Sequence, residues 1–277
     1  MKFKLFLLFT FLGLTPFNSL FSASIIFDIT GFIIKENVGS VLWDIGPTKV
    51  IGLYNPLKIT EDYFSALNQI APHRSDSYKL INDNLVLPQV INDWLSNNKS
   101  SQEIKDFVVN ELKKLEPLLG KKANLFKSIA EHMFTPSRYT KAMDHMTDGI
   151  KILKKCCQQK DASGKRKHKV FLLSNQNSET YKEFFKIKKI KAALELFDDY
   201  VISGDAHMLK PDPAFYEYAF KKFGINPDNE VTIYIDYEAT NITAARNLGK
   251  KQLQCIYCKD YDFKPVVTEL RRFGIFS

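Results

Sequence analysis

The sequence has little of what marks several common enzyme classes. Four cysteines in 277 residues are too few for a small scaffold held together by disulfides. There is no Gly-x-Ser-x-Gly elbow, glycine-rich phosphate loop or His-Glu-x-x-His segment, so the motifs of serine hydrolases, nucleotide-binding proteins and zinc proteases are missing. The chain is 45% hydrophobic and 25% charged, which is typical of a folded globular protein and excludes disorder, collagen and coiled coil.

Charged residues are absent from a long stretch near the N-terminus. Two lysines precede residues 5–27, which carry no charge, and the small residue Ala23 follows the most apolar part of this run. A basic start, an apolar run and a small residue are typical of a secretory signal peptide. We therefore predict a signal peptide over residues 1–23, export to the periplasm or out of the cell, and no stable membrane span after cleavage. The alternative is a membrane anchor formed by residues 5–23, because the uncharged run is long enough to span a bilayer.

Short apolar runs alternate with amphipathic stretches over the rest of the sequence. We expect strands at residues 25–27, 169–174, 200–203, 231–236 and 253–257. Strands that alternate with helices predict an α/β fold with a doubly wound parallel sheet. Ligands of such sheets bind beyond the carboxyl ends of the strands. Four residues lie at or just after those ends and are expected to meet in one pocket: Asp28, Ser174, Lys210 and Asp236.

The order of these residues resembles the four motifs of the haloacid dehalogenase-like (HAD) hydrolase superfamily. The matching segments are Asp28, Ser174-Asn175, Lys210-Pro211-Asp212, and Asp236 followed by Asn241. Each motif is short, but four in the right order, each after an apolar run, form a specific set. The resemblance implies a HAD-like Rossmannoid core over residues 24–34 and 146–277.

The residues between the first and second motifs, 35–145, show no strand-like alternation. The spacing of their apolar side chains predicts helices over residues 60–70, 87–95, 101–115 and 123–132, and a last helix over 139–158 that leads back into the core. An all-helical insert at this point resembles the cap domain of one HAD subclass. We therefore predict a helical cap over residues 35–145 that closes over the substrate and excludes water.

The resemblance implies a role for each residue of the expected pocket. Asp28 matches the nucleophile, which forms an aspartyl intermediate with the substrate. Lys210 would hold Asp28 in its ionised form and neutralise the charge of the substrate. Ser174 and Asn175, together with Lys210, would bind the phosphate or carboxylate oxygens of the substrate.

The resemblance also implies a magnesium site. The expected ligands of Mg²⁺ are a carboxylate oxygen of Asp28, the backbone carbonyl of Thr30, and Asp236, because this cation prefers oxygen ligands. Glu238 and Asn241 would support these ligands from outside the coordination sphere.

Two positions depart from the family pattern. Phosphatases of the family usually carry a second aspartate two residues after the nucleophile, which acts as general acid and base, and this chain has Thr30 there. Loss of one such catalyst lowers a rate by about 10² to 10⁴. The fourth motif usually has two adjacent carboxylates, but Tyr237 follows Asp236 here. The predicted magnesium site is weakened by this tyrosine.

The sequence therefore favours a HAD-like hydrolase that acts on a small anionic substrate, with a phosphate monoester as the first choice. Thr30 and Tyr237 leave two alternatives open: a metal-independent dehalogenase-like hydrolase, and a catalytically impaired HAD-like binding protein. The formal charge of +8 suits an anionic partner. We expect no nucleic-acid partner, because the densest basic run, residues 165–169, is expected in a solvated loop. The oligomeric state is not predicted.

Overall fold

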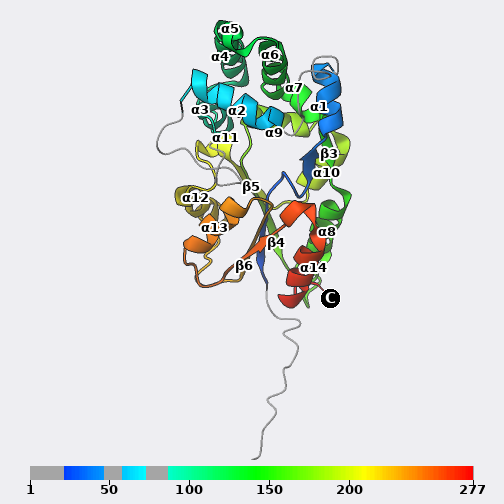
Figure 1. Cartoon of the computed structure of the whole chain (residues 1–277). Helices are drawn as coiled ribbons and strands as arrows, with labels where there is room; N and C mark the ends of the chain where they lie inside the picture. The colour runs from blue at the N-terminus through cyan, green and yellow to red at the C-terminus, as the bar shows by residue number, and fades with distance from the viewer. Residues whose placement is uncertain (1–21, 47–57, 73–86, 277) are drawn as a thin grey trace, which may run out of the picture.

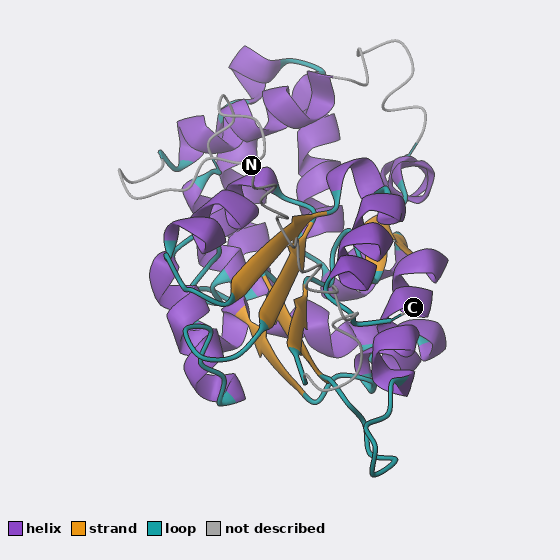
Figure 2. Cartoon of the chain, turned by 90° about the horizontal axis from the view of Figure 1, so that it is seen from below, coloured by secondary structure: helices purple, strands orange, loops and turns teal. Residues whose placement is uncertain are grey.

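Five parallel strands form the centre of the structure, a computed structural model that describes residues 22–46, 58–72 and 87–276. In the order β5-β4-β1-β6-β7 they are Asp199–Ile202, Lys169–Ser174, Ser24–Phe27, Thr232–Asp236 and Leu253–Tyr257. β1 lies in the middle, paired with β4 on one side and β6 on the other. Figure 2 shows these strands surrounded by helices. The predicted α/β class with a doubly wound parallel sheet is confirmed.

Side chains of the central strand alternate between two apolar clusters, as the two-residue period of a strand requires. Ile25 and Phe27 belong to the first cluster and Ile26 to the second. The first cluster includes residues of α8 (Thr147–Gln158), α9 (Ser178–Phe184), α10 (Lys188–Leu194) and α14 (Phe263–Arg272). The second includes residues of α12 (Pro213–Phe223) and α13 (Ala239–Asn247). Both faces of the sheet are therefore covered, and for this reason the central strands are apolar on both sides.

A separate group of helices lies above the sheet in Figure 1. It consists of α1 (Val38–Ile45), α2 (Ile59–Ile70), α3 (Gln89–Leu95), α4 (Ser101–Lys114), α5 (Glu116–Leu119), α6 (Lys122–Met133) and α7 (Pro136–Lys141). These helices share their own apolar cluster, in which Trp94, Phe126 and Phe134 are each 1% exposed. The exact extent of the cap, residues 35–145, stays a prediction.

α4 shows how the sequence builds these helices. Its buried residues Ile104, Val108 and Leu112 recur every four positions, so they form one apolar stripe. A capping box begins the helix: the Ser100 hydroxyl accepts from the Glu103 N–H, and the Glu103 carboxylate accepts from the Ser100 N–H. The helix is therefore determined locally at its start and by packing along its length.

The end of α3 is held against the core near the carboxyl edge of the sheet. Asn177 Nδ2 donates to the backbone oxygen of Trp94 at 2.8 Å, and the Ser203 hydroxyl donates to that of Leu95 at 2.8 Å. Asn177 lies just before α9, and Ser203 begins the short helix α11 (Ser203–Ala206). These contacts place the helical group over the predicted site.

The predicted single helix over residues 139–158 is wrong. Strand β3 (Met143–His145) interrupts it and pairs antiparallel with β2 (Ile34–Glu36), which was not expected either. The pairing is extended by hydrogen bonds from the Met146 N–H to Ile33 O and from the Asn37 N–H to Ala142 O. The segment that leads into the helical group and the segment that leads out of it therefore lie side by side. Each supplies hydrogen-bond partners for the backbone N–H and C=O groups of the other.

The predicted leader, residues 1–23, lies almost wholly outside the described residues. Only Ser22 and Ala23 of it are described. Over the described ranges, none of the helices combines the length and hydropathy needed to cross a bilayer.

Candidate active site

Four elements bring polar side chains together at the carboxyl edge of the sheet. Asp28 follows β1, Ser174 ends β4 and Asp236 ends β6, and these three strands are neighbours. Lys210 comes from the loop between α11 and α12. All four side chains are buried, with 1–3% of each residue exposed. The structure thus places the four predicted residues in one region, as expected for parallel strands that end at the same edge.

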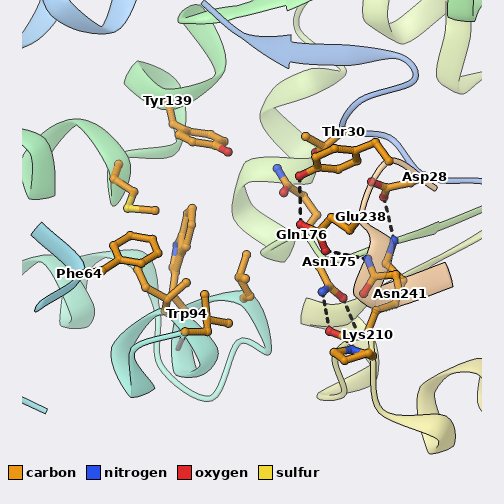
Figure 3. A pocket seen from close by; sticks show the side chains of 16 residues that line it. Asp28, Thr30, Phe64, Trp94, Tyr139, Asn175, Gln176, Lys210, Glu238 and Asn241 are labelled. Atoms are coloured by element: carbon orange, nitrogen blue, oxygen red, sulfur yellow. Dashed lines mark hydrogen bonds and ion pairs between the residues drawn. The ribbon is translucent and has the colours of Figure 1, made fainter. Parts of the chain in front are cut away.

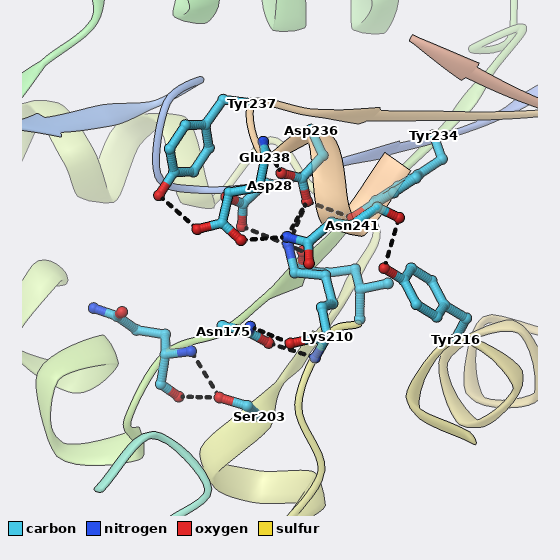
Figure 4. A network of polar contacts seen from close by, with 12 residues as sticks. Asp28, Asn175, Ser203, Lys210, Tyr216, Tyr234, Asp236, Tyr237, Glu238 and Asn241 are labelled. Atoms are coloured by element: carbon cyan, nitrogen blue, oxygen red, sulfur yellow. Dashed lines mark hydrogen bonds and ion pairs between the residues drawn. The ribbon is translucent and has the colours of Figure 1, made fainter. Parts of the chain in front are cut away.

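Lys210 links the two aspartates. Its Nζ lies 3.1 Å from Asp28 Oδ1 and 2.7 Å from Asp236 Oδ2 (Figure 4), and it also donates to the backbone oxygen of Leu173 at 3.1 Å. The side chain of Asn175 fixes the backbone of Lys210, because its Nδ2 donates to Lys210 O at 2.8 Å and its Oδ1 accepts from the Lys210 N–H at 2.7 Å. Asn175 therefore positions the lysine, and its predicted contact with substrate stays a prediction.

Burial and neighbouring charges shift the pKa values of three side chains in this group. Burial raises the pKa of the Asp28 carboxyl to about 6, although the positive charge of Lys210 lowers it. Burial lowers the pKa of Lys210, but the carboxylates of Asp236 and Asp28 outweigh this effect and raise it above its usual value. Burial raises the pKa of Glu238 to about 7, and the nearby charge of Asp236 adds to the effect. The Asp28 carboxyl therefore lies beside a fixed positive charge, which favours its ionised form against the effect of burial.

Asp236 is fully engaged by protein donors. Its Oδ2 accepts from Lys210, from the hydroxyl of Tyr234, and from Asn241 Nδ2 at 3.1 Å. Its Oδ1 accepts from the Glu238 N–H at 2.8 Å. The carboxylate therefore accepts four hydrogen bonds from the protein, one of them from the ammonium group of Lys210.

Tyr237 covers the loop that follows Asp28. Gly31 in that loop has φ +75°, and a Cβ there would lie 2.4 Å from Tyr237 Cγ, so the ring lies directly on the backbone. The Tyr237 hydroxyl donates to Glu238 Oε1 at 3.1 Å, and Asn241 Nδ2 donates to Glu238 Oε2 at 2.7 Å. An aromatic ring thus takes the place that the family pattern gives to a second carboxylate.

The predicted magnesium ligands are only partly free in this arrangement. Mg²⁺ needs several oxygen ligands in near-octahedral geometry. Both oxygens of Asp236 accept hydrogen bonds from protein donors, and the ammonium group of Lys210 lies between Asp28 and Asp236. Over the ranges that the structure describes, no group of three or more His, Cys, Asp or Glu side chains is placed to hold a metal ion. The observed arrangement already supplies its positive charge through Lys210.

A cavity of about 190 Å³ opens above Asp28 (Figure 3). Its core side includes Asp28, Thr30, Asn175, Lys210 and Glu238. Its other side is formed by side chains of the helical group: Phe64, Leu87, Ile91, Trp94, Leu95, Met133 and Tyr139. Gln176 also lines the cavity and was not predicted. Its position directly after Asn175 of the second motif could have indicated that it lies at the site.

Ser174 brings a hydroxyl close to Asp28. The residue is 1% exposed. A hydrogen bond from its side chain lowers the pKa of Asp28, though less than the charge of Lys210 does. The hydroxyl of Ser174 and the ammonium group of Lys210 are therefore placed at the same carboxylate.

Comparison with known proteins identifies the family. Residues 79–254, more than half of the chain, match the family model of haloacid dehalogenase-like hydrolases, and the chain belongs to this family. The predicted family is thereby confirmed; the first motif, Asp28, lies outside the matched residues. No curated protein matches the chain in sequence.

Solved structures share the fold at low sequence identity. A HAD family enzyme from Bacteroides thetaiotaomicron is 16% identical, with a TM-score of 0.56, over 90% of this chain and 99% of that one. The same enzyme in complex with magnesium and inorganic phosphate has a TM-score of 0.52 and 15% identity, over 88% and 98% of the two chains. A dehalogenase has a TM-score of 0.51 and 16% identity, over 92% and 98%. At these identities the likeness establishes the fold alone.

Proposed function

We propose that this HAD-like hydrolase cleaves small organic anions by nucleophilic attack of Asp28, with Lys210 as its resident cation and without a catalytic metal. The observation that carries the proposal is the buried contact of 3.1 Å between Lys210 Nζ and Asp28 Oδ1 at the floor of the cavity. A carboxylate is a weak nucleophile in water and becomes effective when a fixed positive charge holds it and the substrate together.

A phosphate monoester is the first substrate class. Asp28 attacks phosphorus, a P–O bond forms to its carboxylate, and the bond to the leaving group breaks with the electron pair going to the leaving group. Thr30 cannot protonate that group, so esters of acidic alcohols such as phenols should react faster than alkyl esters. A Bacteroides enzyme of similar fold has been solved with inorganic phosphate bound, together with magnesium, and the phosphate supports this substrate class.

The second step returns the enzyme to its starting state. Water attacks phosphorus, the bond to Asp28 breaks, and both protons of the water stay on the phosphate product while the carboxylate is restored. The charge of Lys210 stabilises the negative charge that returns to Asp28. Because Thr30 offers no base for the water, this step should be slow and the aspartyl phosphate long-lived.

A 2-haloacid is the second candidate substrate. It is favoured because protein donors already bind both oxygens of Asp236, and because Thr30 cannot act as a general acid. A halide needs no proton in order to leave, and Lys210 already supplies the positive charge. Here Asp28 displaces the halide from carbon and forms an ester. Water then attacks the carboxyl carbon of this ester, the bond from that carbon to the substrate oxygen breaks, and the 2-hydroxyacid leaves with one proton of the water while the other proton goes to solvent. In ¹⁸O-labelled water, the haloacid route places label in the Asp28 carboxylate, whereas the phosphate route places it in the phosphate.

The test is a substrate panel in the presence of a chelator. Aryl phosphates, alkyl phosphates and 2-haloacids are assayed for release of phosphate or halide by the wild type, Asp28→Asn and Thr30→Asp. We expect turnover in the chelator, its loss in Asp28→Asn, and faster cleavage of alkyl phosphates by Thr30→Asp. Binding without turnover by the wild type would favour the impaired binding protein instead, and activity only with added Mg²⁺ would refute the metal-free site.

We further propose export through the leader predicted over residues 1–23, with the cleavage site placed before Ala23 instead of after it. Ala23 is 4% exposed, its N–H donates to His168 Nδ1 at 3.2 Å, and its oxygen accepts from the Lys169 N–H at 3.1 Å. Cleavage after Ala23 would remove these contacts and leave a charged amino group at the buried Ser24. The mature chain should therefore retain Ala23, and its intact mass after export from cells tests this. A mature N-terminus at Ser24 would contradict it.

A further inference from the structure

The cavity above Asp28 has two chemically different ends. The end on the sheet side carries the charged groups of Asp28, Lys210 and Glu238. The opposite end is formed by apolar side chains of α2, α3 and α6, among them Phe64, Ile91, Trp94 and Met133. Figure 3 shows the rings of Phe64 and Trp94 facing the polar group across the cavity. A ligand that fills the cavity must therefore be charged at one end and apolar at the other.

Among the residues that the structure describes, the apolar end of the cavity offers few hydrogen-bonding groups. Trp94 Nε1 is already used, since it donates to Ser101 Oγ at 3.0 Å, so this residue presents only its ring to the cavity. Tyr139 is the exception, and its hydroxyl is directed toward Thr30 in Figure 3, away from Phe64 and Trp94. A hydroxyl group on the distal part of a substrate would lose its hydrogen bonds to water without replacing them.

Gln176 places one unused donor beside the cavity. The residue is 3% exposed, and its Nε2 has no hydrogen-bond partner in the described part of the chain. Its backbone is held in place, because its N–H donates to Ser203 Oγ at 2.8 Å. A buried amide without a partner is unfavourable, and an oxygen atom of a ligand would satisfy it.

The size of the cavity limits the ligand. Its volume is about 190 Å³. Pockets for drug-sized ligands have about 300–1,000 Å³. The cavity therefore has room for the reacting group and one further ring or short carbon chain.

We propose that the substrate is a small organic anion whose apolar part is about the size of one ring and carries no polar substituent. This part packs against Trp94, Ile91 and Met133. Gln176 donates a hydrogen bond to an oxygen of the anionic part. This proposal rests on the hydrolase function proposed above and narrows its substrate class. It excludes sugar phosphates and other polyhydroxylated esters as good substrates.

The first experiment compares substrates that differ only at the distal end. 4-Methylphenyl phosphate and 4-(hydroxymethyl)phenyl phosphate have similar leaving groups, as do 2-chlorobutanoate and 2-chloro-4-hydroxybutanoate for the haloacid route. We expect kcat/KM to be about 10- to 100-fold higher for the apolar member of the reactive pair, the range in which an apolar pocket rejects an added hydroxyl. Equal values, or a preference for the hydroxylated member, would overturn the proposal and leave the hydrolase function standing.

Two matched variants test the named residues. Met133→Gln keeps the size of a half-buried side chain but adds hydrogen-bonding groups, and it should reduce the preference within the pair by about 10-fold, whereas Met133→Leu should keep it. Gln176→Met removes the donor and keeps the shape, and it should raise KM about 5- to 20-fold for both members with little change in kcat. If Met133→Gln and Met133→Leu behave alike, the apolar end is not where the substrate lies.

A binding measurement separates this proposal from the hydrolase function. Calorimetry with Asp28→Asn compares the Kd values of the two aryl phosphates under conditions without turnover. We expect the methyl compound to bind about 10- to 100-fold more tightly. If the wild type turns over no compound but this ratio is found, the hydrolase function fails and the binding preference stands. If the two Kd values are equal, the preference fails.

Discussion

Replacing Lys210 by methionine should strongly destabilise the folded protein. The ammonium group is buried and contacts two buried carboxylates, at 3.1 Å for Asp28 and 2.7 Å for Asp236. Asp236 keeps three other donors in the variant, but Lys210 is the sole cation paired with Asp28 among the described residues. Removing one partner of a buried ion pair costs about 3–5 kcal/mol, because the remaining charge is left without compensation. We expect this loss in the free energy of unfolding.

The assay is urea denaturation at neutral pH. With a slope of about 2–3 kcal/mol per M for a protein of this size, the midpoint of Lys210→Met should fall by roughly 1–2.5 M. The double variant Asp28→Asn with Lys210→Met removes the uncompensated charge and should recover about 1–3 kcal/mol relative to Lys210→Met alone. The reasoning is refuted if Lys210→Met unfolds at the wild-type midpoint, or if the second substitution adds to the loss.

Three further predictions concern the site and its surroundings. Removing divalent cations with a chelator should leave both activity and the urea midpoint unchanged. Gly31→Ala should destabilise the protein by at least about 1 kcal/mol, because φ is +75° there and the new Cβ meets the ring of Tyr237; a wild-type midpoint would contradict this. Burial lowers the pKa of His168 to about 4, against about 6.5 unfolded, so its contribution to stability is complete above pH 6.5 and is lost as the pH falls toward 4. His168→Gln should flatten that part of the melting temperature–pH profile, and an unchanged slope would count against the assignment.

The position of the site was predictable because strand ends of a parallel sheet share one edge. Asp28, Ser174 and Asp236 each follow a short apolar run, and no long-range information was needed to expect them together. Their detailed contacts depend on three-dimensional packing. One of these contacts could have been predicted from the sequence. Tyr234 and Asp236 are two residues apart on one strand, so their side chains point to the same face, and the Tyr234 hydroxyl donates a hydrogen bond to the Asp236 carboxylate.

Other features could not be predicted from local patterns. The β2–β3 pair joins residues more than a hundred positions apart, and helical periodicity does not report such a pairing. The free donor of Gln176 depends on how Ser203 holds its backbone and on which groups of the helical cluster lie opposite. The engagement of Asp236, which argues against the expected magnesium site, likewise requires Lys210 to be placed in space.

The most direct test of the central claim is the mass of the peptide that contains Asp28 after rapid acid quench of a single turnover. A covalent intermediate on that carboxylate predicts a gain equal to the transferred phosphoryl or acid group, present in the wild type and absent in Asp28→Asn. Since Thr30 offers no base for the second step, this species should accumulate before product appears. Turnover without any adduct on this peptide, or undiminished activity in Asp28→Asn, would contradict the assignment of Asp28 as the nucleophile.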